Sequence, residues 1–213
     1  MEPDFWHERW QQNEIGFHER EANTKLVANF DALSVLPNSR IFVPLCGKTR
    51  DIAWLLSSGH RVVGVELSDM AIQDLFRDLG VEPKITEQGP LTCYAAPDID
   101  IYVGDIFDLP SETLGVVDAI YDRAALVALP EGLRDSYAAH VHAITGGAAQ
   151  LLVCFDYDQA AMAPPPFSIP PAEVDRIHGL NYAISLLEKT EVEGGLKGFC
   201  PAHESCYLLK KPA

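Results

Sequence analysis

The 213-residue sequence has few basic residues: 16 Lys and Arg stand against 31 Asp and Glu, which gives a formal net charge of −15 with neutral histidines. Because so acidic a surface repels phosphate groups, we expect neither nucleic acid nor an anionic membrane as a partner. Long hydrophobic runs are also missing. The stretch from Ala148 to Phe155 contains Gln150 and is far shorter than the roughly 20 residues that cross a bilayer.

Cysteine is scarce and scattered, and the first residues of the chain are neither basic nor apolar. The five cysteines are Cys46, Cys93, Cys154, Cys200 and Cys206. An odd number of dispersed thiols, without a secretory signal, predicts reduced cysteines and a cytoplasmic location. The segment 200–206 contains metal donors, but none follow at zinc-site spacing, and His140 and His142 point to different faces of a predicted helix. We therefore expect no metal site.

Short apolar runs alternate with helical patterns from Arg40 onward, and hydrophobic residues make up 47% of the chain. Continuous apolar runs such as 41–43 and 61–65 are typical of parallel strands covered on both faces. Residues 181–191 and 205–209 have the pattern of a closing antiparallel pair. No repeat or linker divides the sequence. We therefore predict a single α/β domain over residues 1–213, in which residues 1–34 form a helical cap over the ligand crevice.

Glu66 is the most informative single residue. Ligands of such a sheet bind beyond the carboxyl ends of its strands, and Glu66 follows the second predicted strand, about twenty positions after the first strand–helix turn. A carboxylate there binds the two ribose hydroxyls of a nucleoside cofactor. The alternative is an exposed carboxylate at the N-terminus of the following helix.

The first strand–helix turn distinguishes between cofactor classes. Dinucleotide sites need G-x-G-x-x-G, and a phosphate-binding P-loop needs a glycine where Phe42 stands, whereas this turn has Gly47 alone. The predicted cofactor therefore contains ribose but no phosphate. S-adenosylmethionine, an adenosine joined to a methionine tail through a sulfonium, fits this description.

Polar groups follow the third and fourth predicted strands as well. Asp105 would accept from the adenine amino group while Ile106 packs on the ring, or Asp105 would cap a helix. Arg123 would bind the carboxylate of the methionine tail, or form a surface salt bridge to Asp122 or Asp118.

An aromatic cluster stands near the N-terminus, where Trp6, Trp10 and Phe17 share a helical region. Such residues pack in a core, or else they flank a sulfonium and contribute a cation–π contact of ~0.5–2 kcal/mol.

Five motifs of the chain together resemble the thiopurine S-methyltransferase family. They are FWxxRW at 5–10, GFH at 16–18, VPLCGK at 43–48, GHxVVGVELS at 59–68 and YDRAALVAL at 121–129, with a departure at Ala124, where glycine is common. The resemblance implies the class I methyltransferase fold, a Rossmann-like doubly wound sheet of seven strands with the last one antiparallel. It also implies S-adenosylmethionine contacts at Trp10, Leu45, Glu66 and Arg123, and transfer of methyl to the sulfur of thiopurines. Bacterial-type members are associated with selenium and tellurium compounds too.

The acceptor side is expected from the same resemblance. The proline-rich segment 164–171 would form a wall or lid over a small thiol or chalcogen acceptor, with Phe167 facing it and Phe17 and His18 completing an apolar slot. The alternative is a surface loop stiffened by prolines.

Methyl transfer from a sulfonium is an in-line displacement with a neutral leaving group, so no catalytic acid or base is required, and Arg123 is the one candidate to polarise the acceptor. We expect a monomer. Two other functions remain open: a nucleotide-cofactor oxidoreductase, and a non-catalytic module that binds S-adenosylmethionine.

Overall fold

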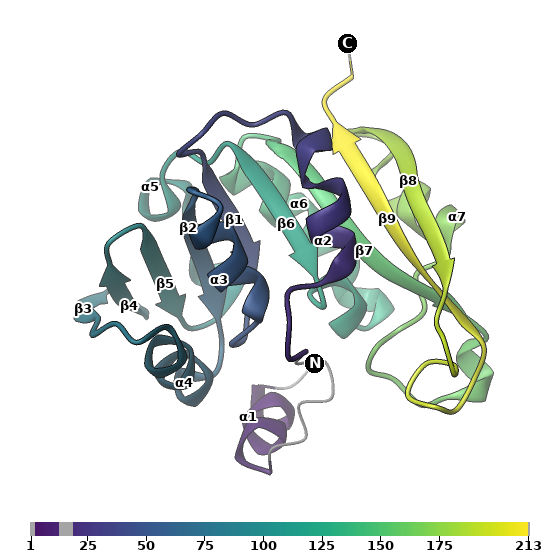
Figure 1. Ribbon diagram of the computed structural model, residues 1–213, viewed down its shortest axis with the longest axis horizontal. Helices are drawn as coiled ribbons and strands as arrows, with labels where there is room; N and C mark the ends of the chain where they lie inside the picture. Colours follow the sequence, from purple (N-terminus) through teal and green to yellow (C-terminus); the bar gives the residue numbers. More distant parts are fainter. Residues whose placement is uncertain (1–2, 13–18, 213) are drawn as a thin grey trace.

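The computed structural model describes residues 3–12 and 19–212, and a single mixed sheet runs through its middle (Figure 1). Its strands are β1 (Arg40–Pro44), β2 (Arg61–Glu66), β3 (Lys84–Gln88), β4 (Leu91–Ala96), β5 (Ile99–Val103), β6 (Ala119–Arg123), β7 (Ala149–Tyr157), β8 (Ala183–Glu191) and β9 (Ala202–Lys210), in the order β3-β4-β5-β2-β1-β6-β7-β9-β8. The pairs among β5, β2, β1, β6 and β7 are parallel, and β9 runs antiparallel to both of its neighbours.

The sheet has nine strands in the described residues, not the seven that were predicted. The seven expected strands form the unit β5-β2-β1-β6-β7-β9-β8, and the hairpin β3–β4 adds two more beside β5. The sequence analysis missed β3 because its five residues, KITEQ, are almost all exposed and carry no buried apolar run. The predicted architecture is otherwise confirmed, including the antiparallel pair at the end of the chain.

Helices cover both faces of the sheet (Figure 1). They are α1 (Pro3–Gln11), α2 (Thr24–Asn29), α3 (Arg50–Ser57), α4 (Asp69–Leu79), α5 (Ser111–Leu114), α6 (Glu131–Ile144) and α7 (Pro171–His178), with short 3-10 turns η1 (Phe30–Leu33), η2 (Ile106–Asp108), η3 (Leu126–Ala128) and η4 (Gln159–Ala161). Side chains set the helix ends, since Ser68 caps α4 by accepting from the Ala71 N–H and Gly80 closes it in a left-handed conformation. No helix in the described ranges is long and apolar enough to cross a membrane.

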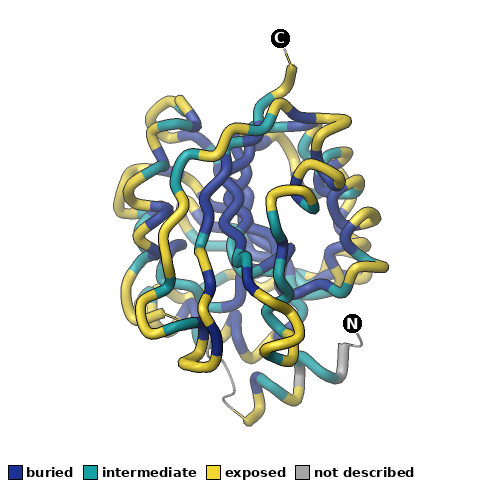
Figure 2. Tube along the Cα trace, turned by 90° about the vertical axis from the view of Figure 1, so that its right-hand side faces the viewer, coloured by how far each residue is buried: buried dark blue, intermediate teal, exposed yellow. Residues whose placement is uncertain are grey.

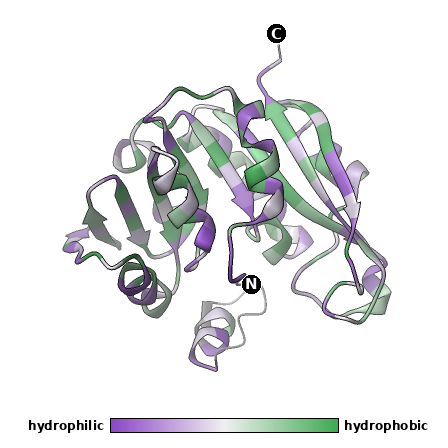
Figure 3. Ribbon diagram, viewed as in Figure 1, coloured by the Kyte–Doolittle hydropathy of each residue, from purple (hydrophilic) through white to green (hydrophobic). Residues whose placement is uncertain are grey.

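Two hydrophobic cores lie on opposite faces of the sheet, because successive side chains of a strand point to opposite sides. In β6, Ile120 joins the core under α6 and α7, whereas Tyr121 joins the core under α2, α3 and α4. The central strands are accordingly the most deeply buried part of the chain (Figure 2) and the most hydrophobic (Figure 3). All five cysteines are buried free thiols.

The predicted N-terminal cap is divided in two. Helix α1 lies beyond the carboxyl ends of the central strands (Figure 1). In contrast, α2 and η1 pack on a face of the sheet, where Leu26, Phe30 and Leu33 belong to the core. Only α1, among the described residues of 1–34, therefore occupies the position predicted for a cap over the crevice.

Gly64 brings β2 close to the loop that follows β1. A Cβ at this position would lie 2.8 Å from Ile101 Cδ1 and 2.9 Å from Cys46 Sγ, closer than real Cβ contacts. The glycine in the run VVGV thus allows the first loop to pack directly against the strand that ends in Glu66.

The two edge strands of the sheet carry exposed charges beside exposed apolar residues such as Ile85 and Leu186. In β3, Lys84 and Glu87 are exposed, and in β8 the exposed residues include Lys189 and Glu191. The register between β8 and β9 also shifts at a bulge next to Leu186.

Candidate active site

A cavity of about 400 Å³ lies at the carboxyl ends of β1, β2, β5 and β6, next to the point between β1 and β6 where the strand order reverses. Its lining comes from α1 (Trp6, Trp10), the loop after β1 (45–49), the end of β2 (65–67), the loop after β5 (104–107) and the segment after β6 (Arg123, Ala124, Ala128, Leu129, Leu133). The structure therefore brings together all six residues predicted to bind the cofactor: Trp10, Leu45, Glu66, Asp105, Ile106 and Arg123. What each of them binds stays a prediction.

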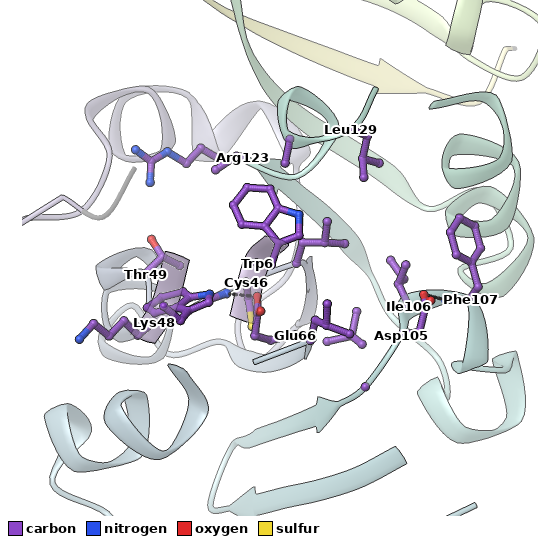
Figure 4. Close-up of a pocket in the computed structure, with 18 of the residues that line it drawn as sticks. Trp6, Cys46, Lys48, Thr49, Glu66, Asp105, Ile106, Phe107, Arg123 and Leu129 are labelled. Carbon is purple, nitrogen blue, oxygen red and sulfur yellow. Dashed lines mark hydrogen bonds between the residues drawn. The ribbon is translucent and has the colours of Figure 1, made fainter. Parts of the chain in front are cut away.

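The cavity has two chemically different ends with a carboxylate between them (Figure 4). Lys48, Thr49 and Arg123 lie toward one end, whereas Ile106 and Phe107 lie toward the other. Trp6 and Glu66 stand in the middle. Asp105 also lies toward the end with Ile106 and Phe107. Among the described residues, the lining thus changes from cationic at one end to apolar with a single carboxylate at the other.

Glu66 is held by the backbone of two loops. The side chain is buried, at 7% exposure, so it is not the solvent-exposed carboxylate of the alternative interpretation. Its Oε2 accepts from the Gly47 N–H at 2.8 Å, and its Oε1 accepts from the Ser68 N–H at 2.9 Å. These two bonds fix the orientation of the carboxylate. Glu66 is thus fixed before any ligand arrives.

Arg123 ends β6 and its side chain is only 8% exposed. Its Nη2 donates to Glu19 Oε1 at 2.6 Å, an ion pair across 104 positions of sequence. The surface salt bridge to Asp122 or Asp118 was therefore wrong. Asp122 points to the opposite face of the sheet, toward Tyr137, and the carboxylate of Asp118 accepts from the backbone of β1 instead.

The loop after β5 is fixed at both of its predicted ligand-binding residues. The carboxylate of Asp105 accepts from the Phe107 N–H at 3.0 Å, so the capping interpretation holds while Asp105 still lines the cavity. Ile106 is buried at 7% exposure, and its carbonyl oxygen lies 2.8 Å from Nε2 of His140 on α6. This anchor by His140 was not predicted, because nothing in the sequence pairs the helix with the loop.

The residues predicted to contact the methyl acceptor are not found among the described residues that line the cavity, in contrast to those predicted to bind the cofactor. Phe17 and His18 lie outside the described residues. Phe167 packs against the core under α6, with the guanidinium of Arg134 over its ring at 5.2 Å, and its N–H donates to the Val127 carbonyl. It is not among the described residues that line the cavity. The wall or lid role of 164–171 therefore stays a prediction.

Two non-glycine residues at the cavity have left-handed backbone conformations. Leu45 follows β1 with φ 45°, and Ala124 follows β6 with φ 63°. A left-handed conformation costs an L-residue roughly 1–2 kcal/mol, and such strain gathers at functional sites. Ala124, where the resemblance described above leads us to expect glycine, thus has a backbone conformation that favours glycine.

Side chains at the end of β6 form hydrogen bonds on both faces of the sheet. Tyr121 donates through its hydroxyl to Asp51 Oδ2 at 3.0 Å on the α3 side. On the other side, the Tyr137 hydroxyl donates to Asp122 Oδ2 at 2.7 Å, and the Leu126 N–H donates to Oδ1. Burial raises the pKa of Asp122 to about 6. These bonds fix the turn that carries Arg123 and Ala124.

The fold is similar to that of S-adenosylmethionine-dependent methyltransferases. The chain superposes on the 1,6-didemethyltoxoflavin-N1-methyltransferase of Burkholderia thailandensis, solved with S-adenosylhomocysteine, with a TM-score of 0.67 at 14% identity, covering 99% of this chain and 87% of that one. It also superposes on the magnesium protoporphyrin IX methyltransferase of Synechocystis with a TM-score of 0.62 at 14% identity, covering 98% and 97%. The fold is thus that of the class I methyltransferases, as predicted.

Sequence comparison narrows this class to one family. The family model of thiopurine S-methyltransferase matches residues 1–211. A thiopurine S-methyltransferase of Xanthobacter autotrophicus is 56% identical over 212 residues (99% of this chain, all of the relative), and one of Gluconobacter oxydans is 50% identical over 203 residues (95% and 92%). The chain belongs to the thiopurine S-methyltransferase family, so the predicted family and enzyme class are confirmed.

Proposed function

We propose that this protein transfers the methyl group of S-adenosylmethionine to the sulfur of small aromatic or heterocyclic thiols, such as thiopurines. The observation that carries the proposal is the buried carboxylate of Glu66, oriented by two backbone N–H groups in the middle of a cavity that has no dinucleotide loop. Membership of the thiopurine S-methyltransferase family supports the same reaction.

The residues of the cavity fit each part of the proposed cofactor. Glu66 would accept hydrogen bonds from both ribose hydroxyls. Ile106 would pack on the adenine while Asp105 accepts from its amino group. At the other end, Arg123 would bind the carboxylate of the methionine tail, because a buried guanidinium offers a planar pair of donors. When bound, the cofactor supplies an electrophilic methyl group on a positively charged sulfur.

The work left to the protein is alignment and exclusion of water. The sulfur that loses the methyl group becomes neutral, so no residue has to protonate it. Aromatic thiols ionise readily, so no strong base has to be held beside them. Trp6 and Trp10 would cover the cavity from α1 and place an aromatic surface near the sulfonium. In this proposal, the protein accelerates the transfer by aligning the cofactor with the acceptor and by excluding water from between them.

The remaining proposals concern the surroundings of the reaction. We propose that segment 164–171 forms one wall of the acceptor site, that selenium and tellurium compounds are further acceptors, and that the enzyme is a cytoplasmic monomer. Buried thiols without disulfides agree with a reducing compartment. Cell fractionation tests the location, and light scattering tests the monomer.

Calorimetric titration tests the cofactor first, with S-adenosylhomocysteine and NADH as competing candidates. Binding of S-adenosylhomocysteine without binding of NADH is expected, and the reverse would identify a nucleotide-dependent oxidoreductase. A second assay follows transfer of a radiolabelled methyl group to a panel of thiopurines, other aromatic thiols, selenols and tellurite. A protein that binds S-adenosylhomocysteine but methylates nothing in the panel would be a binding module rather than an enzyme.

A further inference from the structure

The cationic end of the cavity already contains an anion that belongs to the protein. Arg123 lines the cavity, and its guanidinium donates to the carboxylate of Glu19 at 2.6 Å. The two partners differ in burial, because the side chain of Arg123 is 8% exposed and that of Glu19 is 45% exposed. The ion pair therefore joins a fixed group to one that can turn into solvent.

The position of Glu19 is limited by a firm anchor that comes shortly after it. Asn23 is buried, and its N–H donates to the buried carboxylate of Asp51 at 2.7 Å. Lys25 is buried as well, and its Nζ donates to Thr190 on β8 at 2.6 Å. Release of the Glu19 side chain into solvent would break the weak contact of its Oε2 with Asn23 Nδ2 at 3.5 Å, but it would leave the Asn23 N–H and the Lys25 side chain anchored.

A second carboxylate, that of Glu204, lies in the electrostatic environment of this ion pair. Glu204 on β9 reaches the Asn23 side-chain amide at 3.4 Å, and burial raises the pKa of Glu204 while the charge of Arg123 lowers it. The carboxylate of a ligand could replace that of Glu19 as the partner of Arg123. The guanidinium would then be paired with an anion both before and after the exchange. Such an exchange costs far less than exposing a bare buried charge.

We infer that Glu19 occupies the position on Arg123 that the cofactor carboxylate takes, so that Glu19 competes with the cofactor and lowers its affinity. This inference rests on the proposed function, in which Arg123 binds that carboxylate. The apparent affinity of a ligand falls by the fraction of protein that is competent to bind it. Ligands without a carboxylate do not meet this competition.

Two ligands, three single variants and one double variant test the competition. S-adenosylhomocysteine carries the carboxylate, whereas 5′-methylthioadenosine has the same adenosine and thioether without it. By calorimetry, Glu19→Gln should bind S-adenosylhomocysteine roughly fivefold more tightly than the natural protein, the change that an ion pair of ~1 kcal/mol gives. Affinity for 5′-methylthioadenosine should not change. Glu21→Gln, an equal loss of charge at an exposed neighbour, should change neither affinity.

The third variant, Arg123→Ala, shows whether Glu19 acts through the arginine. In that background, Glu19→Gln should no longer raise the affinity for S-adenosylhomocysteine. Thermal unfolding of each variant confirms that it is folded. Equal S-adenosylhomocysteine binding by Glu19→Gln and the natural protein would overturn the inference, and so would weaker binding, which would make Glu19 a partner of the ligand's ammonium group. If the natural protein bound neither ligand, the proposed function itself would fail.

Discussion

Glu66 and Asp122 are both buried carboxylates near the carboxyl end of a strand, but they face different surroundings. Glu66 ends β2, faces the cavity and accepts from the backbone N–H groups of two loops. Asp122 lies next to last in β6, faces the core and accepts from the Tyr137 hydroxyl and the Leu126 N–H. Of the two buried carboxylates, Glu66 lines the cavity and is the one proposed to bind a ligand, whereas Asp122 holds the core together.

The largest expected effect concerns the structural carboxylate. The folded-state pKa of Asp122 is raised to about 6, so the folded protein binds more protons than the unfolded one between pH 4 and 6. The stability that Asp122 contributes is therefore fully present below pH 4 and is lost as pH rises through 6, by about 3 kcal/mol in all. Urea unfolding at pH 4 and pH 7 should show this loss in the natural protein but not in Asp122→Asn. Equal pH dependence in the two proteins would contradict the assignment.

The role proposed for Glu66 is tested by measuring the affinity for a ligand rather than the stability of the protein. Glu66→Ala removes the proposed acceptor for two hydroxyls, a loss of order 1–3 kcal/mol, so S-adenosylhomocysteine should bind about 5- to 150-fold more weakly. Calorimetry measures the change, and Glu82→Ala, at an exposed glutamate, serves as the control. Unchanged affinity in a folded Glu66→Ala protein would show that both carboxylates are structural.

A smaller effect is expected on the other side of β6. Tyr121→Phe leaves the Asp51 carboxylate without one of its donors in a buried site, which should lower the free energy of unfolding by about 1–2 kcal/mol. Because Asp51 also anchors Asn23, the loss would extend to the start of α2. Chemical denaturation gives the free energy, and hydrogen exchange of the Asn23 amide shows whether the anchor loosens. A variant as stable as the natural protein would show that the hydroxyl is replaceable by water.

The smallest effect is expected at the turn after β6. Ala124→Gly relieves a left-handed conformation worth roughly 1–2 kcal/mol but loses about 0.5–1 kcal/mol through the greater freedom of the unfolded chain. We expect stabilisation of up to about 1 kcal/mol. The control is Ala125→Gly, whose φ of −88° offers no such relief, and it should destabilise. Thermal unfolding of the pair separates the two outcomes.

The sequence allowed much of the fold to be predicted because buried parallel strands are continuous apolar runs, as in β1 and β2. It did not reveal β3, which is exposed, or α7, which follows a proline-rich stretch and begins at Pro171. Five of the six residues predicted to bind the cofactor end a strand or closely follow one, which is why their place at the cavity could be predicted, whereas Trp10 lies in α1 and was expected from the family resemblance alone. The ion pair of Arg123 with Glu19 could not, because no local pattern relates side chains that far apart.

The exposed charges on β3 and the bulge in β8 affect whether the edges of the sheet can pair with a strand of another copy of the protein. An incoming strand that paired with β3 would meet the charges of Lys84 and Glu87, and one that paired with β8 would meet the bulge beside Leu186. An edge strand without such features is a template for aggregation, because its unpaired backbone groups can pair with another chain. Charged side chains and bulges are common features that prevent this pairing. The charges on β3 and the bulge in β8 thus disfavour the addition of a further strand at either edge of the sheet.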